Sequence, residues 1–184
     1  MFEPNRSAFH VEDVDAVIVN SAGCGAALRE YDDPLAGKIR DVSEFLVDAG
    51  LRAPTHALEG LVAYDDPCHL LHGQRVAAAP RALLRAIPGL RVMDLPGASD
   101  CCGAAGIYGL THPEMSGRLR ARKVDAIRET RPNFVATGNP GCLMQIAQGV
   151  RQAGLEVEVL HPVELLARAY GFAPELLRPS RKSR

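Results

Sequence analysis

Four cysteines at wide, uneven spacing constrain this chain more than any other feature of its sequence. Between Cys68 and the adjacent pair Cys101-Cys102 lie 32 residues, and 39 more separate the pair from Cys142. Adjacent cysteines suit an ordinary disulfide poorly, because their sulfurs would close a small, strained ring. They suit a single metal site, because both thiolates can point at one centre, and thiolates select zinc or iron–sulfur clusters. The wide gaps indicate ligands from separate loops of one folded domain.

The composition is that of a globular protein and excludes several other classes. The chain has 184 residues, 47% of them apolar, and a formal net charge of -1. This balance provides no basic surface for nucleic acid, and no run of about 18 apolar residues predicts a membrane span. Residues 1–15 are charged and lack the apolar centre of a secretory signal. We therefore expect a cytoplasmic protein, in which an odd number of cysteines indicates metal binding or catalysis.

Short apolar runs alternate with amphipathic stretches along the chain. Strands are predicted at 14–19, 61–64, 91–95, 134–137 and 157–160, and helices at 26–31, 39–49, 81–87, 113–129, 143–153 and 162–170. This alternation predicts an α/β fold of mostly parallel sheets with flanking helices. His161 is expected to cap the last helix, which Pro162 begins. The basic run from Arg118 to Lys123 is interpreted as a solvated helix face.

An internal repeat divides the chain. The segment from Asp15 to Cys24 resembles the segment from Asn133 to Cys142, since each contains a strand, a turn, a Gly-Cys pair and a helix start. The first copy has no cysteine pair before Cys24. We therefore expect residues 1–59 to be the truncated remainder of a first unit, residues 60–171 a complete second unit, and residues 172–184 a flexible tail.

Three motifs around the cysteines resemble those of the cysteine-rich CCG domain, which occurs in heterodisulfide reductase B subunits and in iron–sulfur subunits of flavin-dependent 2-hydroxyacid oxidases. The motifs are 66–72 (Asp-Pro-Cys-His-Leu-Leu-His), 101–108 (Cys-Cys-Gly-Ala-Ala-Gly-Ile-Tyr) and 138–145 (Gly-Asn-Pro-Gly-Cys-Leu-Met-Gln). They are closest to the C-terminal part of the glycolate oxidase iron–sulfur subunit, and the similarity runs from Asp15 to Gly171. The chain departs from that family in lacking the ferredoxin-type Cys-x2-Cys-x2-Cys runs, and in having Gln145 where many CCG domains have a further cysteine.

The resemblance implies a [4Fe–4S] cluster on Cys68, Cys101, Cys102 and Cys142, the four thiolates that a cubane needs. The chain would then be a non-catalytic electron-transfer subunit. It would work with an FAD-containing 2-hydroxyacid oxidase subunit and a ferredoxin-like segment, in the cytoplasm or at the inner face of the membrane. Cys24, the counterpart of Cys142, is either a ligand of a second cluster or an orphan thiol.

Three alternatives stay open. One is disulfide reduction of the heterodisulfide reductase type, against which Gln145 argues. Another is a structural Zn²⁺ site on some of the four cysteines and His69. In the cluster interpretation, His69 is a hydrogen-bond donor to sulfur, or simply a histidine bonded to a backbone carbonyl. The last alternative is a fragment from a split or mis-started reading frame.

Overall fold

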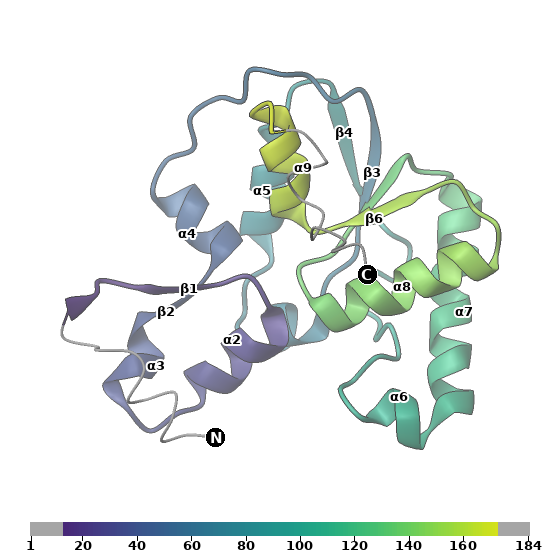
Figure 1. Ribbon diagram of the computed structural model, residues 1–184, viewed down its shortest axis with the longest axis horizontal. Helices are drawn as coiled ribbons and strands as arrows, with labels where there is room; N and C mark the ends of the chain where they lie inside the picture. Colours follow the sequence, from purple (N-terminus) through teal and green to yellow (C-terminus); the bar gives the residue numbers. More distant parts are fainter. Residues whose placement is uncertain (1–12, 173–184) are drawn as a thin grey trace, which may run out of the picture.

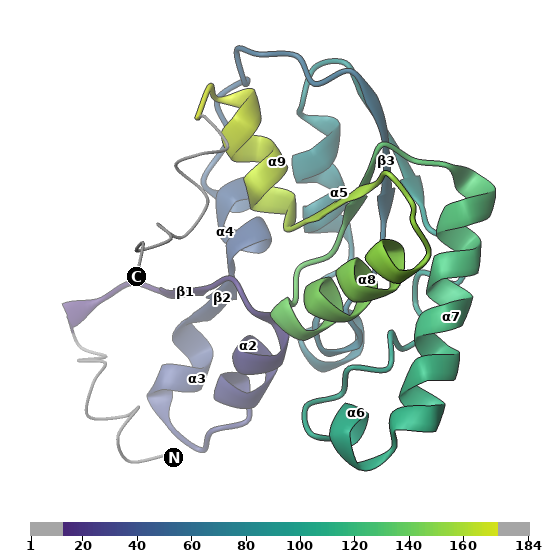
Figure 2. The same cartoon turned by 45° about the vertical axis from the view of Figure 1, so that its right-hand side comes forward.

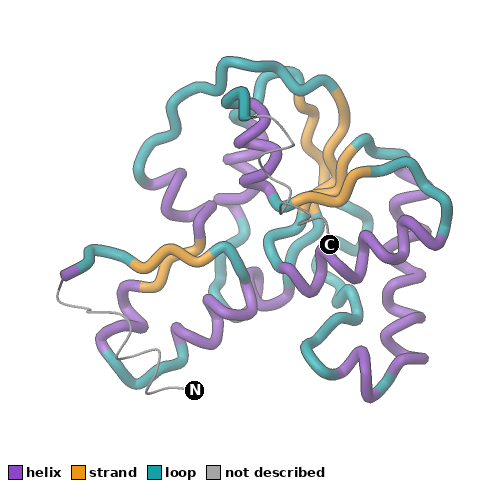
Figure 3. The backbone as a smooth tube through the Cα atoms, in the orientation of Figure 1, coloured by secondary structure: helices purple, strands orange, loops and turns teal. Residues whose placement is uncertain are grey.

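Two parallel sheets form the frame of the protein in the computed structural model, which describes residues 13–172 (Figure 1). The smaller sheet pairs β1 (Val17–Val19) with β2 (Ile39–Asp41). The larger has the order β4 (Leu90–Asp94), β3 (Gly60–Tyr64), β5 (Phe134–Ala136), β6 (Glu158–Leu160), and each neighbouring pair is parallel. Figure 3 shows both groups of strands in orange. The predicted α/β class is therefore confirmed.

Helices cover both faces of the larger sheet. In chain order the helices are α2 (Ala22–Arg29), α3 (Pro34–Lys38), α4 (Val42–Asp48), the π-helical turn η2 (His69–Gly73), α5 (Ala78–Arg85), α6 (Tyr108–Thr111), α7 (Pro113–Thr130), α8 (Pro140–Gln152) and α9 (Pro162–Ala169). Val62 and Tyr64 pack toward α5 and α9, whereas Ala63 packs toward α7 and α8. This is the alternation expected along a strand, and Figures 1 and 2 show the two helical layers on opposite sides.

The parallel topology explains how cysteines far apart in sequence meet. Cys68 follows β3, the pair Cys101-Cys102 follows β4, and Cys142 lies in the helix that follows β5. Because the carboxyl ends of parallel strands lie at one edge of a sheet, these three loops emerge side by side. The sulfur atoms are thus brought together at the carboxyl edge of the larger sheet.

The structure corrects one predicted helix. Residues 39–49 do not form a single helix, because Ile39–Asp41 is a strand paired with β1. Ile39 and Asp41 are buried and Arg40 is exposed, so a period of two holds over these three residues. The helix begins only at Val42, where the Asp41 side chain accepts a hydrogen bond from the Ser43 N–H at 2.8 Å.

The two repeated segments have the same local structure. Ser21 and Asn139 both adopt extended backbone before a helix, and Cys24 and Cys142 are each the third residue of that helix. The predicted helices at 26–31 and 143–153 therefore begin earlier than expected. A division of the chain near residue 60 remains a prediction, and all but Phe172 of the predicted tail lies outside the described residues.

No helix within residues 13–172 has the length and apolar composition needed to cross a membrane.

The last helix begins as predicted. His161 accepts a hydrogen bond from the Val163 N–H at 3.2 Å, and the Glu164 carboxylate accepts one from the His161 N–H at 2.7 Å. This reciprocal arrangement is a capping box.

Candidate metal centre

All five cysteines of the chain line one cavity of about 580 Å³. Its walls come from the start of η2 (Cys68, His69), the loop after β4 (Cys101, Cys102, Ala104, Ala105, Gly106), the start of α8 (Asn139, Gly141, Cys142) and the start of α2 (Ser21, Gly23, Cys24). None of the five is in a disulfide. The structure thus brings Cys24 and His69 to the same cavity as the four cysteines predicted to be ligands.

Burial and neighbouring thiols shift the pKa values of three cysteines in this cavity, Cys68, Cys102 and Cys142. A hydrogen bond from Cys142 lowers the pKa of Cys102 to about 7, although burial opposes this. The same bond, together with burial and the charge on Cys102, raises the pKa of Cys142. Burial raises the pKa of Cys68, and charges on Cys101 and Cys102 raise it further. A bound metal would offset this repulsion, because its own charge stabilises several thiolates at once.

The glycine after the cysteine pair has a steric reason. Gly103 has φ +88°, a left-handed conformation that other residues rarely adopt. A Cβ atom there would lie 2.6 Å from the Ser116 carbonyl oxygen. The close approach lets the Ser116 hydroxyl donate to the Gly103 carbonyl at 2.8 Å, and the Gly103 N–H donates to the Cys101 sulfur at 3.3 Å. Only glycine therefore permits this loop to turn back onto α7.

A buried ion pair ties together the three loops that bear the cysteines. Lys123 on α7 contacts the Asp65 carboxylate at 2.5 Å, and both side chains are almost wholly buried. The Lys123 ammonium also donates to the carbonyls of Gly97 and Ala98, at 2.6 and 3.2 Å. The Thr137 hydroxyl lies 3.5 Å from the other Asp65 oxygen. Asp65 precedes Cys68, the carbonyls precede the cysteine pair, and Thr137 precedes Cys142.

The interpretation of the whole basic run as a solvated face is therefore wrong at Lys123. A signal for burial is present in the sequence. Ser116, Lys123 and Ile127 are spaced by seven and four residues, which places them on one side of a helix. Ser116 and Ile127 are buried as well. The helical spacing of these three residues therefore predicts the burial of Lys123, although a lysine is usually exposed.

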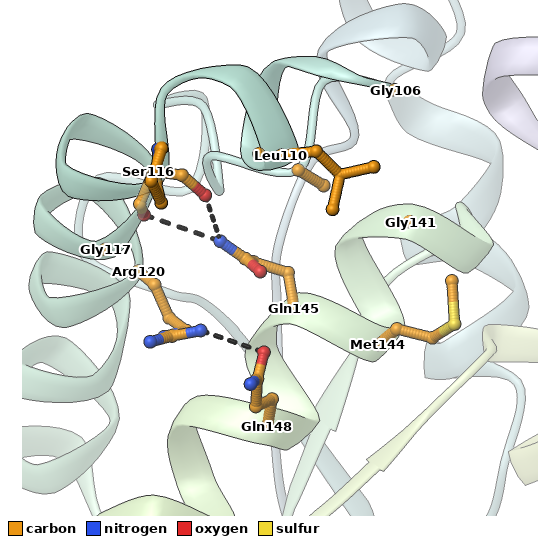
Figure 4. A pocket seen from close by; sticks show the side chains of 12 residues that line it. Gly106, Leu110, Ser116, Gly117, Arg120, Gly141, Met144, Gln145 and Gln148 are labelled. Carbon is orange, nitrogen blue, oxygen red and sulfur yellow. Dashed lines mark hydrogen bonds between the residues drawn. The ribbon is translucent and has the colours of Figure 1, made fainter.

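Gln145 is bonded to Ser116 and does not line the cysteine cavity. Its amide nitrogen donates to the Ser116 hydroxyl at 2.8 Å and lies 3.4 Å from the Ser116 carbonyl oxygen, as Figure 4 shows. It lines a neighbouring pocket of about 540 Å³, which also includes Leu110, Arg120 and Met144. This pocket adjoins the cysteine cavity, because both are bounded by Ala104, Gly106 and Gly141.

The donors of this cavity are thiols, which select zinc or iron–sulfur clusters. Around one tetrahedral zinc ion, thiolates at about 2.3 Å from the metal lie ~3.8 Å from one another. Within residues 13–172, no three Cys, His, Asp or Glu side chains converge closely enough to hold one ion. The thiols that line the cavity are the soft donors that iron–sulfur clusters take.

The fold and the cavity together define a parallel α/β protein that gathers cysteines from separate loops. A model of the CCG cysteine-rich domain matches residues 62–147, the segment that contains Cys68, the cysteine pair and Cys142. The chain belongs to this family of cysteine-rich proteins.

Several curated proteins are similar over most of the chain. The probable glycolate oxidase iron-sulfur subunit of Bacillus subtilis is 38% identical over 184 residues, covering 91% of this chain and 41% of that protein. The glycolate oxidase iron-sulfur subunit of Escherichia coli is 33% identical over 169 residues, covering 84% and 40%. Lactate utilization protein A of Bacillus cereus is 30% identical over 169 residues, covering 84% and 71%. The chain thus spans less than half the length of the first two relatives.

Proposed function

We propose that this chain is the cluster-bearing part of an iron–sulfur oxidoreductase subunit, which passes electrons within a 2-hydroxyacid oxidase-type complex. The observation that carries the proposal is the single cavity at the carboxyl edge of the larger sheet, into which separate loops bring every cysteine of the chain. The relatives named as iron–sulfur subunits of glycolate oxidase support the same class of function.

Cys68, Cys101, Cys102 and Cys142 would hold a [4Fe–4S] cluster, which supplies one-electron redox chemistry when bound. The protein's part is to orient these thiolates and to adjust their surroundings. The Nδ1 atom of His69 lies 3.6 Å from the Cys68 sulfur, and a proton donated there would raise the reduction potential. Asn139 does the same for Cys142, since its amide nitrogen lies 3.6 Å from that sulfur.

The surroundings of the cavity favour electron exchange with a partner protein. Ile107, Leu110 and Met144 are exposed by 75%, 83% and 66%, and they lie on the loop and helices that flank the cysteines. Such apolar side chains near a redox centre are suited to contact with another protein. We assign that partner as an FAD-containing subunit that oxidises the hydroxyacid, with a ferredoxin-like segment carrying electrons onward, in the cytoplasm or at the inner membrane face.

The test separates a carrier from a catalyst. The cluster-loaded chain alone should not oxidise glycolate or lactate with artificial acceptors, because the substrate chemistry belongs to the flavin. Addition of the FAD subunit should allow the hydroxyacid to reduce the cluster. This reduction is monitored as a loss of the cluster's visible absorbance. Cys102→Ser serves as the control and should abolish that signal. Catalytic reduction of a thiol disulfide by the isolated chain would contradict the carrier role and favour heterodisulfide-type chemistry.

A further inference from the structure

We infer that Cys24 supplies a fifth thiolate to the same cluster site, so that the site joins the N-terminal segment to the rest of the chain. This inference rests on the proposed iron–sulfur function. Cys24 lies outside residues 62–147, the region that the cysteine-rich domain model matches. It nonetheless lines the cavity together with Cys68, Cys101, Cys102 and Cys142.

The two helix starts that bear Cys24 and Cys142 are bonded to each other. The Ala22 N–H donates to the Gly138 carbonyl at 3.1 Å, and the Gly23 N–H donates to the Asn139 side-chain oxygen at 3.0 Å. The Asn139 amide nitrogen in turn faces the Cys142 sulfur at 3.6 Å. One asparagine therefore holds the first turn of α2 against the first turn of α8, with both cysteines at the third helical position.

The loop that bears Cys68 also holds α2 in place. The Gln74 amide donates to the Ala22 carbonyl at 2.9 Å, and Arg29 donates to the Gln74 carbonyl at 3.1 Å. The contact is close, because a Cβ atom on Gly25 would lie 2.5 Å from the Gln74 amide nitrogen. Since α2 cannot move away without breaking these bonds, Cys24 has a fixed place at the cavity wall.

The side chain of Cys24 has no packing role that would explain its position. Ala22 and Ala26 on the same helix are buried, whereas Cys24 is exposed. A cysteine without a chemical role is usually buried as a small apolar residue. Gln145, the position where the family motif often has a further cysteine, is bonded to Ser116 and directed into the neighbouring pocket (Figure 4). Cys24 is therefore the fifth thiol at the cavity wall, beside the four proposed ligands.

Alkylation of the whole chain tests the assignment directly. Protein with and without a cluster reconstituted from ferrous iron and sulfide is treated with iodoacetamide, and each cysteine is quantified by mass spectrometry. Cys24 should be labelled in the cluster-free protein and lose that labelling when the cluster is present, as Cys68 and Cys101 do. Removal of iron with a chelator should restore it, because a metal-bound thiolate is a poor nucleophile.

A variant distinguishes ligation from simple covering by the cluster. Cys24→Ser should shift the reduction potential upward or lose the cluster, because one negative ligand is removed. Ala27→Ser, at an exposed position of the same helix, is the matched control and should behave as the wild type. Full labelling of Cys24 while the cluster is bound, or an unchanged potential and spectrum in Cys24→Ser, overturns the assignment and leaves the proposed function standing. A wild-type chain that takes up neither iron nor sulfide overturns both.

Discussion

Removal of the Lys123 ammonium should destabilise the fold and the metal centre together. Lys123→Met keeps a long, unbranched side chain, one atom shorter than lysine, but leaves the Asp65 carboxylate, 1% exposed, without its cation. The carbonyls of Gly97 and Ala98 also lose their donor. Breaking a buried ion pair by removing one partner costs about 3–5 kcal/mol. This is a large share of a free energy of unfolding of about 5–15 kcal/mol.

The loss should depend on pH in a defined direction. Burial raises the pKa of Asp65 to about 6 even though Lys123 lowers it. The folded state therefore holds this proton more tightly than the unfolded chain. The protonated Asp65 carboxyl therefore contributes stability that is complete when the pH is below 3.8, its ordinary pKa. This contribution is lost as the pH rises through about 6. Without Lys123 the carboxyl pKa rises further, so the deficit of Lys123→Met relative to wild type should shrink as pH falls from about 8 to about 5.

Urea unfolding of the cluster-free protein, followed by circular dichroism at several pH values, measures this deficit. The double variant Asp65→Asn with Lys123→Met removes both charges and should lose less stability than the two single variants added together. A Lys123→Met variant within about 1 kcal/mol of wild type at about pH 8, with no dependence on pH, would refute the structural role of the pair.

Two further outcomes follow from the geometry of the site. Gly103→Ala should lose most of its cluster, because its Cβ atom would lie 2.6 Å from the Ser116 carbonyl oxygen. Gly106→Ala is the control and should keep the cluster, because Gly106 also has positive φ but has open space around it. Equal iron content in the two variants would exclude the steric argument. Burial lowers the pKa of His161 from 6.5 to about 4. The stability due to neutral His161 is therefore complete above about pH 6.5 and lost, by about 3 kcal/mol, as pH falls to about 4. His161→Asn, which retains a capping group, should flatten that part of the stability curve, and an unaltered curve would disprove the assignment.

The sequence predicts the larger sheet well, because its strands are short apolar runs. They are flanked by segments in which apolar residues recur at helical spacing. The cysteine positions follow from that topology, since each lies just beyond the carboxyl end of a strand. β2 is missed for a local reason. Three residues are too few to show a strand period before a helix of similar composition.

The placement of Cys24 could not be predicted from local pattern. It depends on hydrogen bonds that Asn139 and Gln74 make with α2, across 116 and 52 positions of the chain. The repeat made Cys24 equivalent to Cys142, but equivalence in sequence does not reveal that two helix starts face one cavity. Lys123 is similar, because only its partner Asp65, 58 positions away, explains why a lysine is buried.

Iron and sulfide analysis of the anaerobically purified chain tests the central claim most directly. The account predicts a brown protein with about four iron and four sulfide per chain, the content of a [4Fe–4S] cluster. Cys102→Ser, which removes a buried thiol from the cavity wall, should lose most of both. A colourless protein that contains zinc in a one-to-one ratio, with neither iron nor sulfide, would contradict the account.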